Sequence, residues 1–163
     1  MRYVQTSSRL VLAAALATLV LAGCGSASHT SAPSTVATTT VPPTAAITVT
    51  WESFFGPSGN AYEIQGMNAV LQPAYTKSRS GSLGKGSSAT VSSVKMQTAA
   101  SCASNQVPSP CAEVTYNILI NGTVALPNAT GYATEVGGKW LVAKATFCAL
   151  ESLEDGSPPA GCS

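Results

Sequence analysis

The side chains of this chain that could transfer protons are few and widely spaced. His29 is the only histidine and Asp155 the only aspartate, the first in a Ser/Thr-rich stretch and the second in a Gly/Pro-containing tail. Glu63, Glu113 and Glu135 fall in separate predicted elements. General acid–base catalysis requires such groups to be placed together within reach of a substrate. We therefore expect no enzymatic activity, no cofactor and no bound metal.

The amino terminus has the pattern of an exported precursor. Two arginines precede an apolar run of twelve residues over residues 10–21, which is shorter than the roughly 20 residues that a membrane span needs. The run ends in Leu21-Ala22-Gly23-Cys24, which resembles the lipobox of bacterial lipoproteins. This resemblance implies a signal peptide over residues 1–23 and a diacylglycerol on the thiol of Cys24. Two or three acyl chains would anchor the protein stably to the membrane.

Other interpretations of Cys24 remain. An ordinary buried thiol is one, although it would not require small residues at the two preceding positions. A leader that is cut at a soluble site, for instance after Ala27, is the other. Since the lipobox explains both the small residues and the thiol, we expect a protein held at the extracytoplasmic face of the cell membrane.

Four further cysteines lie toward the carboxyl terminus, and an even number in an oxidising compartment indicates two disulfides. Sequence alone allows three pairings. We favour Cys102 with Cys111, which closes a proline-containing loop, and Cys148 with Cys162, which fixes the carboxy-terminal tail. A zinc site is the alternative, but the thiols form no Cys-x-x-Cys pair and no histidine joins them.

Composition divides the chain further. Residues 24–46 are rich in Ser, Thr, Ala and Pro without hydrophobic periodicity, so we expect a disordered tether. A single folded domain is expected over residues 47–163, long enough for one modest core. Without Arg2 and Arg9 of the leader, six of the eight Lys and Arg residues remain against seven acidic ones. This balance gives nucleic acid no basic surface to bind.

The first half of the domain has the spacing of helices. Trp51, Phe54 and Phe55 recur at i, i+3 and i+4, which places them on one helix face, and Gly56-Pro57 ends that helix. A second helix is predicted over residues 60–73, because an Asn and a Glu at its start have capping-box spacing.

The second half is predicted to form a sheet. A Gly/Ser-rich loop over residues 77–88 precedes it, and Asn121-Gly122 and Gly137-Gly138 are hairpin signals. Proline cannot donate to a strand ladder, so a bulge or bend is expected near Pro127-Asn128. The predicted strands cover residues 89–98, 112–121, 123–136 and 139–147.

This order of elements predicts an α+β domain in which N-terminal helices pack on a curved four-stranded antiparallel sheet. Three of its segments are similar to the small secreted antigen and lipoprotein family of mycobacteria and related actinobacteria. These segments are Trp51-Glu52-Ser53-Phe54-Phe55, Val114-Thr115-Tyr116 and Gly137-Gly138-Lys139-Trp140-Leu141-Val142. The resemblance implies a cystatin-like cone of the nuclear-transport-factor-2 type over most of residues 47–163.

A curved sheet that closes over helices leaves a concave space, and apolar pockets with few polar groups are the usual small-molecule sites. We predict a mainly apolar, non-catalytic cavity lined partly by Trp51, Phe55, Met67, Tyr116 and Trp140. Aromatic residues at these spacings are also typical of plain core. The chain is thus expected to be an envelope domain that binds a small apolar ligand, or alternatively a structural or partner-binding surface protein that acts on an envelope protein through its exterior.

Overall fold

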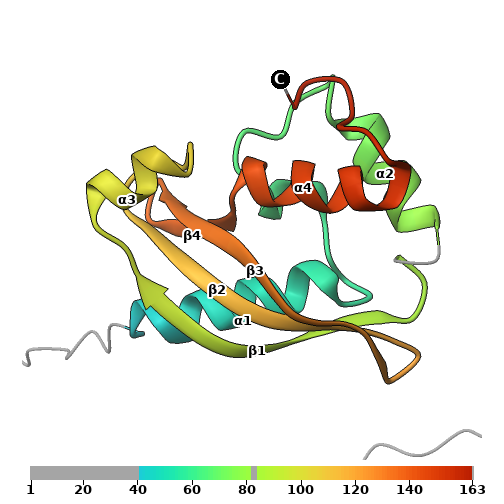
Figure 1. Ribbon diagram of the computed structural model, residues 1–163, viewed down its shortest axis with the longest axis horizontal. Helices are drawn as coiled ribbons and strands as arrows, with labels where there is room; N and C mark the ends of the chain where they lie inside the picture. The colour runs from blue at the N-terminus through green and yellow to red at the C-terminus, as the bar shows by residue number, and fades with distance from the viewer. Residues whose placement is uncertain (1–40, 82–83, 163) are drawn as a thin grey trace, which may run out of the picture. The chain divides into compact units, whose positions relative to one another are not determined.

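The computed structural model describes residues 41–81 and 84–162, which belong to one compact unit. The predicted signal peptide, Cys24 and most of the predicted tether lie outside the described residues. In chain order the elements are α1 (Pro43–Phe55), the 3-10 turn η1 (Ala61–Glu63), α2 (Gln72–Ser80), β1 (Ser87–Met96), α3 (Ala99–Ser104), β2 (Cys111–Ile120), β3 (Thr123–Val136), β4 (Lys139–Val142) and α4 (Lys144–Asp155) (Figure 1). The expected α+β class, with a four-stranded antiparallel sheet, is confirmed.

The sheet is a meander in the order β1-β2-β3-β4. Both predicted hairpins are present, and at Asn121-Gly122 the two turn residues have φ of 51° and 80°, the left-handed conformation that a tight hairpin turn requires. The expected irregularity near Pro127-Asn128 is also present. Tyr116 pairs with Ala129 whereas Ile118 pairs with Leu126, so the register shifts at that point.

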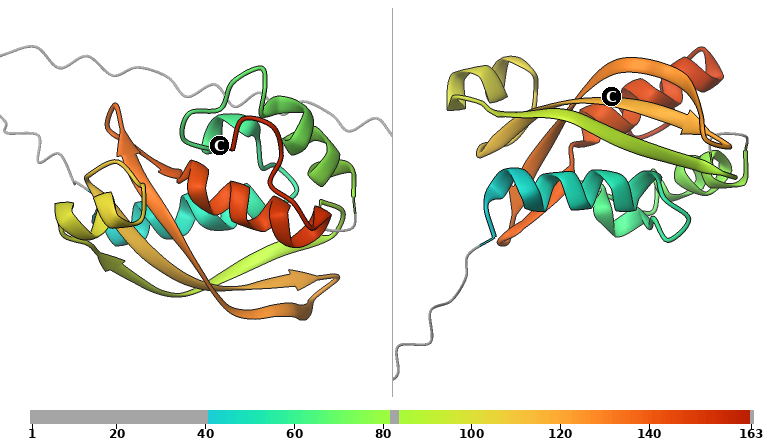
Figure 2. Two further views of the ribbon diagram at one scale, coloured as in Figure 1. Left: turned by 45° about the horizontal axis from the view of Figure 1, so that its top comes forward. Right: turned by 90° about the horizontal axis from the view of Figure 1, so that it is seen from below.

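One face of the sheet carries the core. Along β2 the buried side chains alternate with half-exposed ones, and Val114, Tyr116 and Ile118 point inward. Figure 2 shows α1 and α4 on the same side of the curved sheet, and both helices contribute to the cluster that contains these residues. The sheet and the two helices therefore share one core.

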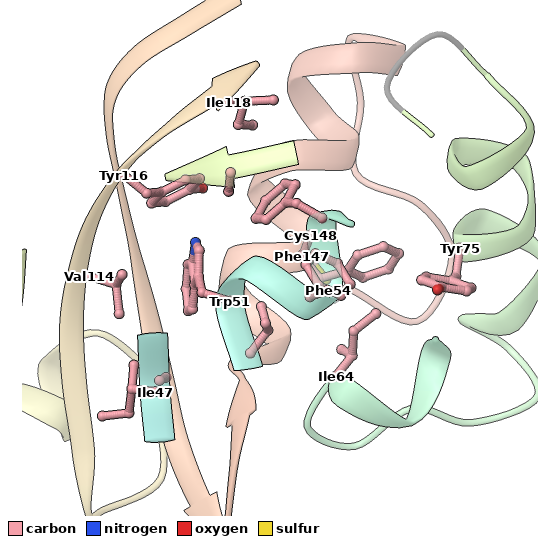
Figure 3. Packing of buried hydrophobic residues seen from close by; sticks show 14 of the residues in the cluster. Ile47, Trp51, Phe54, Ile64, Tyr75, Val114, Tyr116, Ile118, Phe147 and Cys148 are labelled. Carbon is pink, nitrogen blue, oxygen red and sulfur yellow. The ribbon is translucent and has the colours of Figure 1, made fainter. Parts of the chain in front are cut away.

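The centre of this core is aromatic. Trp51 is fully buried and meets Tyr116 edge to face, with ring centroids 5.1 Å apart, and Figure 3 shows its indole nitrogen turned toward Tyr116. This arrangement is favourable because the electropositive edge of one ring meets the electronegative face of the other. A Cβ on Gly131 of β3 would lie 2.9 Å from Trp51 and 2.6 Å from Thr146, so glycine leaves the space that both side chains fill.

Two disulfides fix the ends of elements to their neighbours. Cys102 of α3 bonds to Cys111 at the start of β2, and Cys148 of α4 bonds to Cys162 in the tail. These are the two pairs favoured by the sequence analysis.

The helix predicted over residues 60–73 is wrong. The capping box itself is present, since the Asn60 N–H donates to Glu63 at 2.9 Å, but it caps only the short turn η1. The chain then takes an irregular path through Gly66, whose φ is 70°. Pro73, predicted to end a helix, lies instead in the first turn of α2, where its missing N–H needs no partner.

The strand predicted over residues 139–147 is also partly wrong, because β4 ends at Val142 and α4 follows. A short apolar run is compatible with either a strand or a helix, and periodicity separates the two only over a longer stretch. Phe147, Leu150 and Glu151 have the i, i+3, i+4 spacing of a helix face, and this face turns inward.

Smaller boundaries differ as well. The first helix begins at Pro43, before the domain start expected at residue 47, and proline suits this position at a helix start. Helix α2 extends to Ser80 and so occupies part of the loop predicted over residues 77–88. Asp155, which the sequence analysis assigned to a Gly/Pro-containing tail, is the last residue of α4 and forms an ion pair with Lys77 of α2 at 2.6 Å.

Candidate functional site

A cleft lies where α1, α2 and α4 converge over β2, and it encloses about 40 Å³. This space holds only a few water molecules. Figure 3 shows Phe54, Tyr75 and Phe147, one from each of these helices, gathered in this region. The apolar part of the lining consists of Phe54, Phe55, Ile118, Phe147 and Leu150, and the polar part of Tyr75, Ser78, Arg79 and Glu151. The cleft is therefore amphipathic.

Two helices supply the polar part of the cleft by the same spacing. Tyr75, Ser78 and Arg79 follow one another at i, i+3 and i+4 on α2, and this spacing places them on one face of the helix. On α4 the lining residues Phe147, Leu150 and Glu151 have the same spacing. Because α2 and α4 face each other across the cleft, their side chains converge on it.

Glu151 is a buried carboxyl group, with only 4% of its surface exposed. Burial raises its pKa from 4.5 to about 7, and the neighbouring carboxylates of Glu154 and Asp155 act in the same direction. A hydrogen bond from Ser78 and the charge of Lys77 oppose this shift. The carboxyl group therefore exchanges its proton near neutral pH.

Tyr75 brings a second buried polar group to the cleft. Its side chain is 7% exposed, and its hydroxyl has no hydrogen-bond partner among the residues that the structure describes. Burial raises the pKa of Tyr75, with the charge of Arg79 opposing it, so the hydroxyl stays protonated and can donate. An unpaired buried hydroxyl costs about 1–3 kcal/mol, and an oxygen of a ligand would relieve this cost.

Arg79 places a cation at the same cleft. Its Nη2 donates to the carbonyl oxygens of Gly56, at 2.8 Å, and Pro57, at 3.4 Å, which holds the side chain against the end of α1. Within residues 41–81 and 84–162 the guanidinium forms no ion pair with a carboxylate. A guanidinium has five N–H donors, so it retains capacity for an anion.

The structure brings together three of the five residues predicted to line a cavity. Phe55 lines the cleft, and its ring lies 5.5 Å from that of Tyr116, which in turn contacts Trp51. Trp51 and Tyr116 thus form the layer beneath the cleft, where burial raises the pKa of Tyr116 to about 12. Met67 is half-buried at the border of the core, and Trp140 lies at a separate surface depression.

The sequence analysis missed all four polar residues of the cleft, which are Tyr75, Ser78, Arg79 and Glu151. Their signal was the i, i+3, i+4 spacing within α2 and within α4. This helical spacing was missed because residues 77–88 were expected to be a loop and residues 139–147 a strand.

The acidic residues considered first for catalysis do not line this cleft. Glu63 accepts hydrogen bonds from the Ser53 hydroxyl, at 2.6 Å, and from the Asn60 N–H, so it stabilises the turn after α1. Glu113 and Glu135 lie on β2 and β3. In the part of the chain that the structure describes, no cluster of three His, Cys, Asp or Glu residues is placed to hold a metal ion, and no helix is long and apolar enough to cross a membrane.

Together, these features define a small disulfide-bonded α+β domain with an amphipathic cleft. The family model described as "Low molecular weight antigen MTB12, C-terminal domain" matches residues 40–157, so the chain belongs to this family. The resemblance to the mycobacterial antigen family is thereby confirmed, and membership fits a small secreted or envelope protein. Neither the curated proteins nor the solved structures yielded a match, and the cystatin-like cone stays a prediction.

Proposed function

We propose that this protein is a lipid-anchored envelope protein whose domain binds a small, largely apolar ligand without catalysing a reaction. The cleft between α2 and α4, together with the apolar groove that adjoins it along α4, carries this proposal. Small-molecule sites are mostly apolar and contain a few well-placed polar groups, and this cleft has both, including the unpaired hydroxyl of Tyr75. The antigen family supports a non-enzymatic role.

A fluorescent probe tests the binding function. N-phenyl-1-naphthylamine is apolar and uncharged, and we expect it to bind the folded protein saturably at one site. Ser78 lines the cleft and is half-buried, so Ser78→Phe should fill the cleft and abolish this binding. Thr76→Phe is the matched control, because Thr76 is exposed on the same helix and does not line the cleft. Non-saturable binding to the wild type, or equal binding to both variants, would rule out a ligand site in this cleft.

The lipid anchor rests on the sequence Leu21-Ala22-Gly23-Cys24. Acyl chains on Cys24 would hold the domain outside the cytoplasm, close to membrane lipids. We expect Cys24→Ala to abolish partitioning into the detergent phase and to leave uncleaved precursor, while Ser26→Ala keeps normal processing. Normal cleavage and partitioning of Cys24→Ala would refute lipidation.

A partner-binding function through the exterior is the second candidate. Its support is Tyr62, which is 86% exposed and lines the same surface depression as the half-buried Trp140. Tyrosine and tryptophan are enriched at protein interfaces. A photo-crosslinker at position 62 should capture one defined envelope protein if this candidate holds, and Tyr62→Ala should then release that protein from a pull-down.

A further inference from the structure

We infer that the ligand is an anionic single-chain amphiphile, an acyl chain that ends in a carboxylate or phosphate, with its head beside Arg79 and Tyr75 and its chain in the groove along α4. The inference rests on the proposed binding function and names the ligand class. It follows from the apolar surface that adjoins the cleft and from the cation and the unpaired hydroxyl that line it.

The cleft adjoins an apolar groove. Ile118 and Leu150 line the cleft and also a groove of about 240 Å³ between α4 and the hairpin that joins β2 to β3. Leu126 and Leu153 line this groove and extend into a neighbouring one of about 300 Å³. The cleft alone is too small for a whole ligand, whereas the cleft and the groove together form a polar end with an apolar track.

The track exposes apolar surface that a chain would cover. Leu153 is 73% exposed although it lies on the helix that closes the core. On the other wall the register shift at Pro127-Asn128 displaces β3 relative to β2, and these two residues line the neighbouring groove beside Leu126. Each methylene buried in such a groove tightens binding about fourfold, so affinity should rise with chain length until the groove is filled.

The charges orient the ligand. Arg79 offers a cation with no carboxylate partner in the described ranges, and the hydroxyl of Tyr75 offers an unpaired donor, so an anionic oxygen suits this end. The carboxyl group of Glu151 lines the same cleft, and because burial raises its pKa to about 7, its protonated form can donate to the anionic head. The head is thereby placed at α2 and the chain along α4.

Competition against the probe N-phenyl-1-naphthylamine tests this ligand class, with four amphiphiles of equal chain length used below their micelle concentrations. Dodecanoate and dodecyl phosphate carry an anionic head, dodecanol an uncharged one and dodecyltrimethylammonium a cationic one. We expect the anionic amphiphiles to displace the probe at least about tenfold more tightly than the other two. Whichever of the two anions binds more tightly identifies the head group as carboxylate or phosphate.

Variants of the protein test separately how the head group and the acyl chain of the ligand contribute to binding. Arg79→Gln should weaken both anions about tenfold and leave dodecanol within twofold of the wild type. Leu153→Gln should weaken all four compounds about threefold or more, and Val49→Gln, another exposed aliphatic residue but on α1, should weaken none. A melting temperature within a few degrees of the wild type confirms that each variant is folded.

Three results would overturn the inference. If the probe binds but the four heads compete equally, the binding function stands and the ligand class is wrong. The same conclusion follows if Arg79→Gln weakens dodecanol as much as dodecanoate. If the probe does not bind the wild type at all, the binding function itself fails.

Discussion

Replacing Glu151 with glutamine should remove most of the pH dependence of stability of this domain between pH 5 and pH 8. Glutamine keeps the shape of the side chain and can still hydrogen-bond to Ser78, but it carries no charge at any pH. The buried carboxyl group binds its proton more tightly in the folded state, with a pKa of about 7, than in the unfolded state, with a pKa of 4.5. Between these values the folded state holds more protons, so the free energy of unfolding falls as pH rises.

The size of the effect follows from the shift. A rise of the pKa from 4.5 to about 7 corresponds to at most about 3 kcal/mol of the free energy of unfolding. This contribution is present below pH 4.5 and is lost as the pH rises through 7. Small domains have unfolding free energies of about 5–15 kcal/mol, so this change is large enough to measure. Glu151→Gln should therefore be as stable as the wild type near pH 4 and more stable by about 1–3 kcal/mol at pH 8.

Urea unfolding followed by tryptophan fluorescence at pH 4, 5, 6, 7 and 8 measures this difference. Glu52→Gln is the matched control, because Glu52 is exposed on α1 and is not among the charges that shift the pKa of Glu151, so this variant should keep the wild-type pH profile. A Glu151→Gln profile that falls as steeply with pH as that of the wild type would refute the reasoning, since the pH dependence would then arise elsewhere in the chain.

Further predictions concern the core, a disulfide and a turn. Gly131→Ala should lower the free energy of unfolding by about 1–3 kcal/mol, because the added methyl group would meet two buried side chains at under 3 Å; a normal melting temperature would show that the core yields there. The double change Cys102→Ser with Cys111→Ser should cost about 2–3 kcal/mol in denaturant unfolding without reductant, and no loss would show that the bond adds no stability. Gly122→Val, at φ 80°, should cost about 1–2 kcal/mol in thermal unfolding, whereas an unchanged stability would argue against a left-handed turn residue.

The sheet could be predicted from sequence because its signals are local. Asn121-Gly122 and Gly137-Gly138 determine two turns, and the alternation along β2 determines which side chains face the core. The irregularity at Pro127-Asn128 follows from the missing proline N–H. Each of these signals depends on a few consecutive residues, so it can be recognised without knowledge of the tertiary structure.

The two helices that supply the polar side of the cleft, α2 and α4, could not be predicted in the same way. The irregular segment before α2 depends on long-range contacts, such as the hydrogen bond from the Gln65 N–H to the Val142 carbonyl at 2.8 Å. Helix α4 begins directly after β4, where its first residues continue an apolar run that fits a strand equally well. Glu151 is buried only because α2 and α4 pack together, and no local sequence pattern predicts this packing.

The most direct test of a ligand site in this cleft is a methyl NMR titration of the protein with dodecanoate. Ile118, Leu126, Leu150 and Leu153 line the cleft and its groove, whereas Val49 and Val136 are exposed elsewhere and serve as internal references. We predict saturable shifts of the first four residues, with nuclear Overhauser contacts to the acyl chain and unchanged references. Shifts that are absent, or that affect Val49 and Val136 equally, would contradict the proposed site.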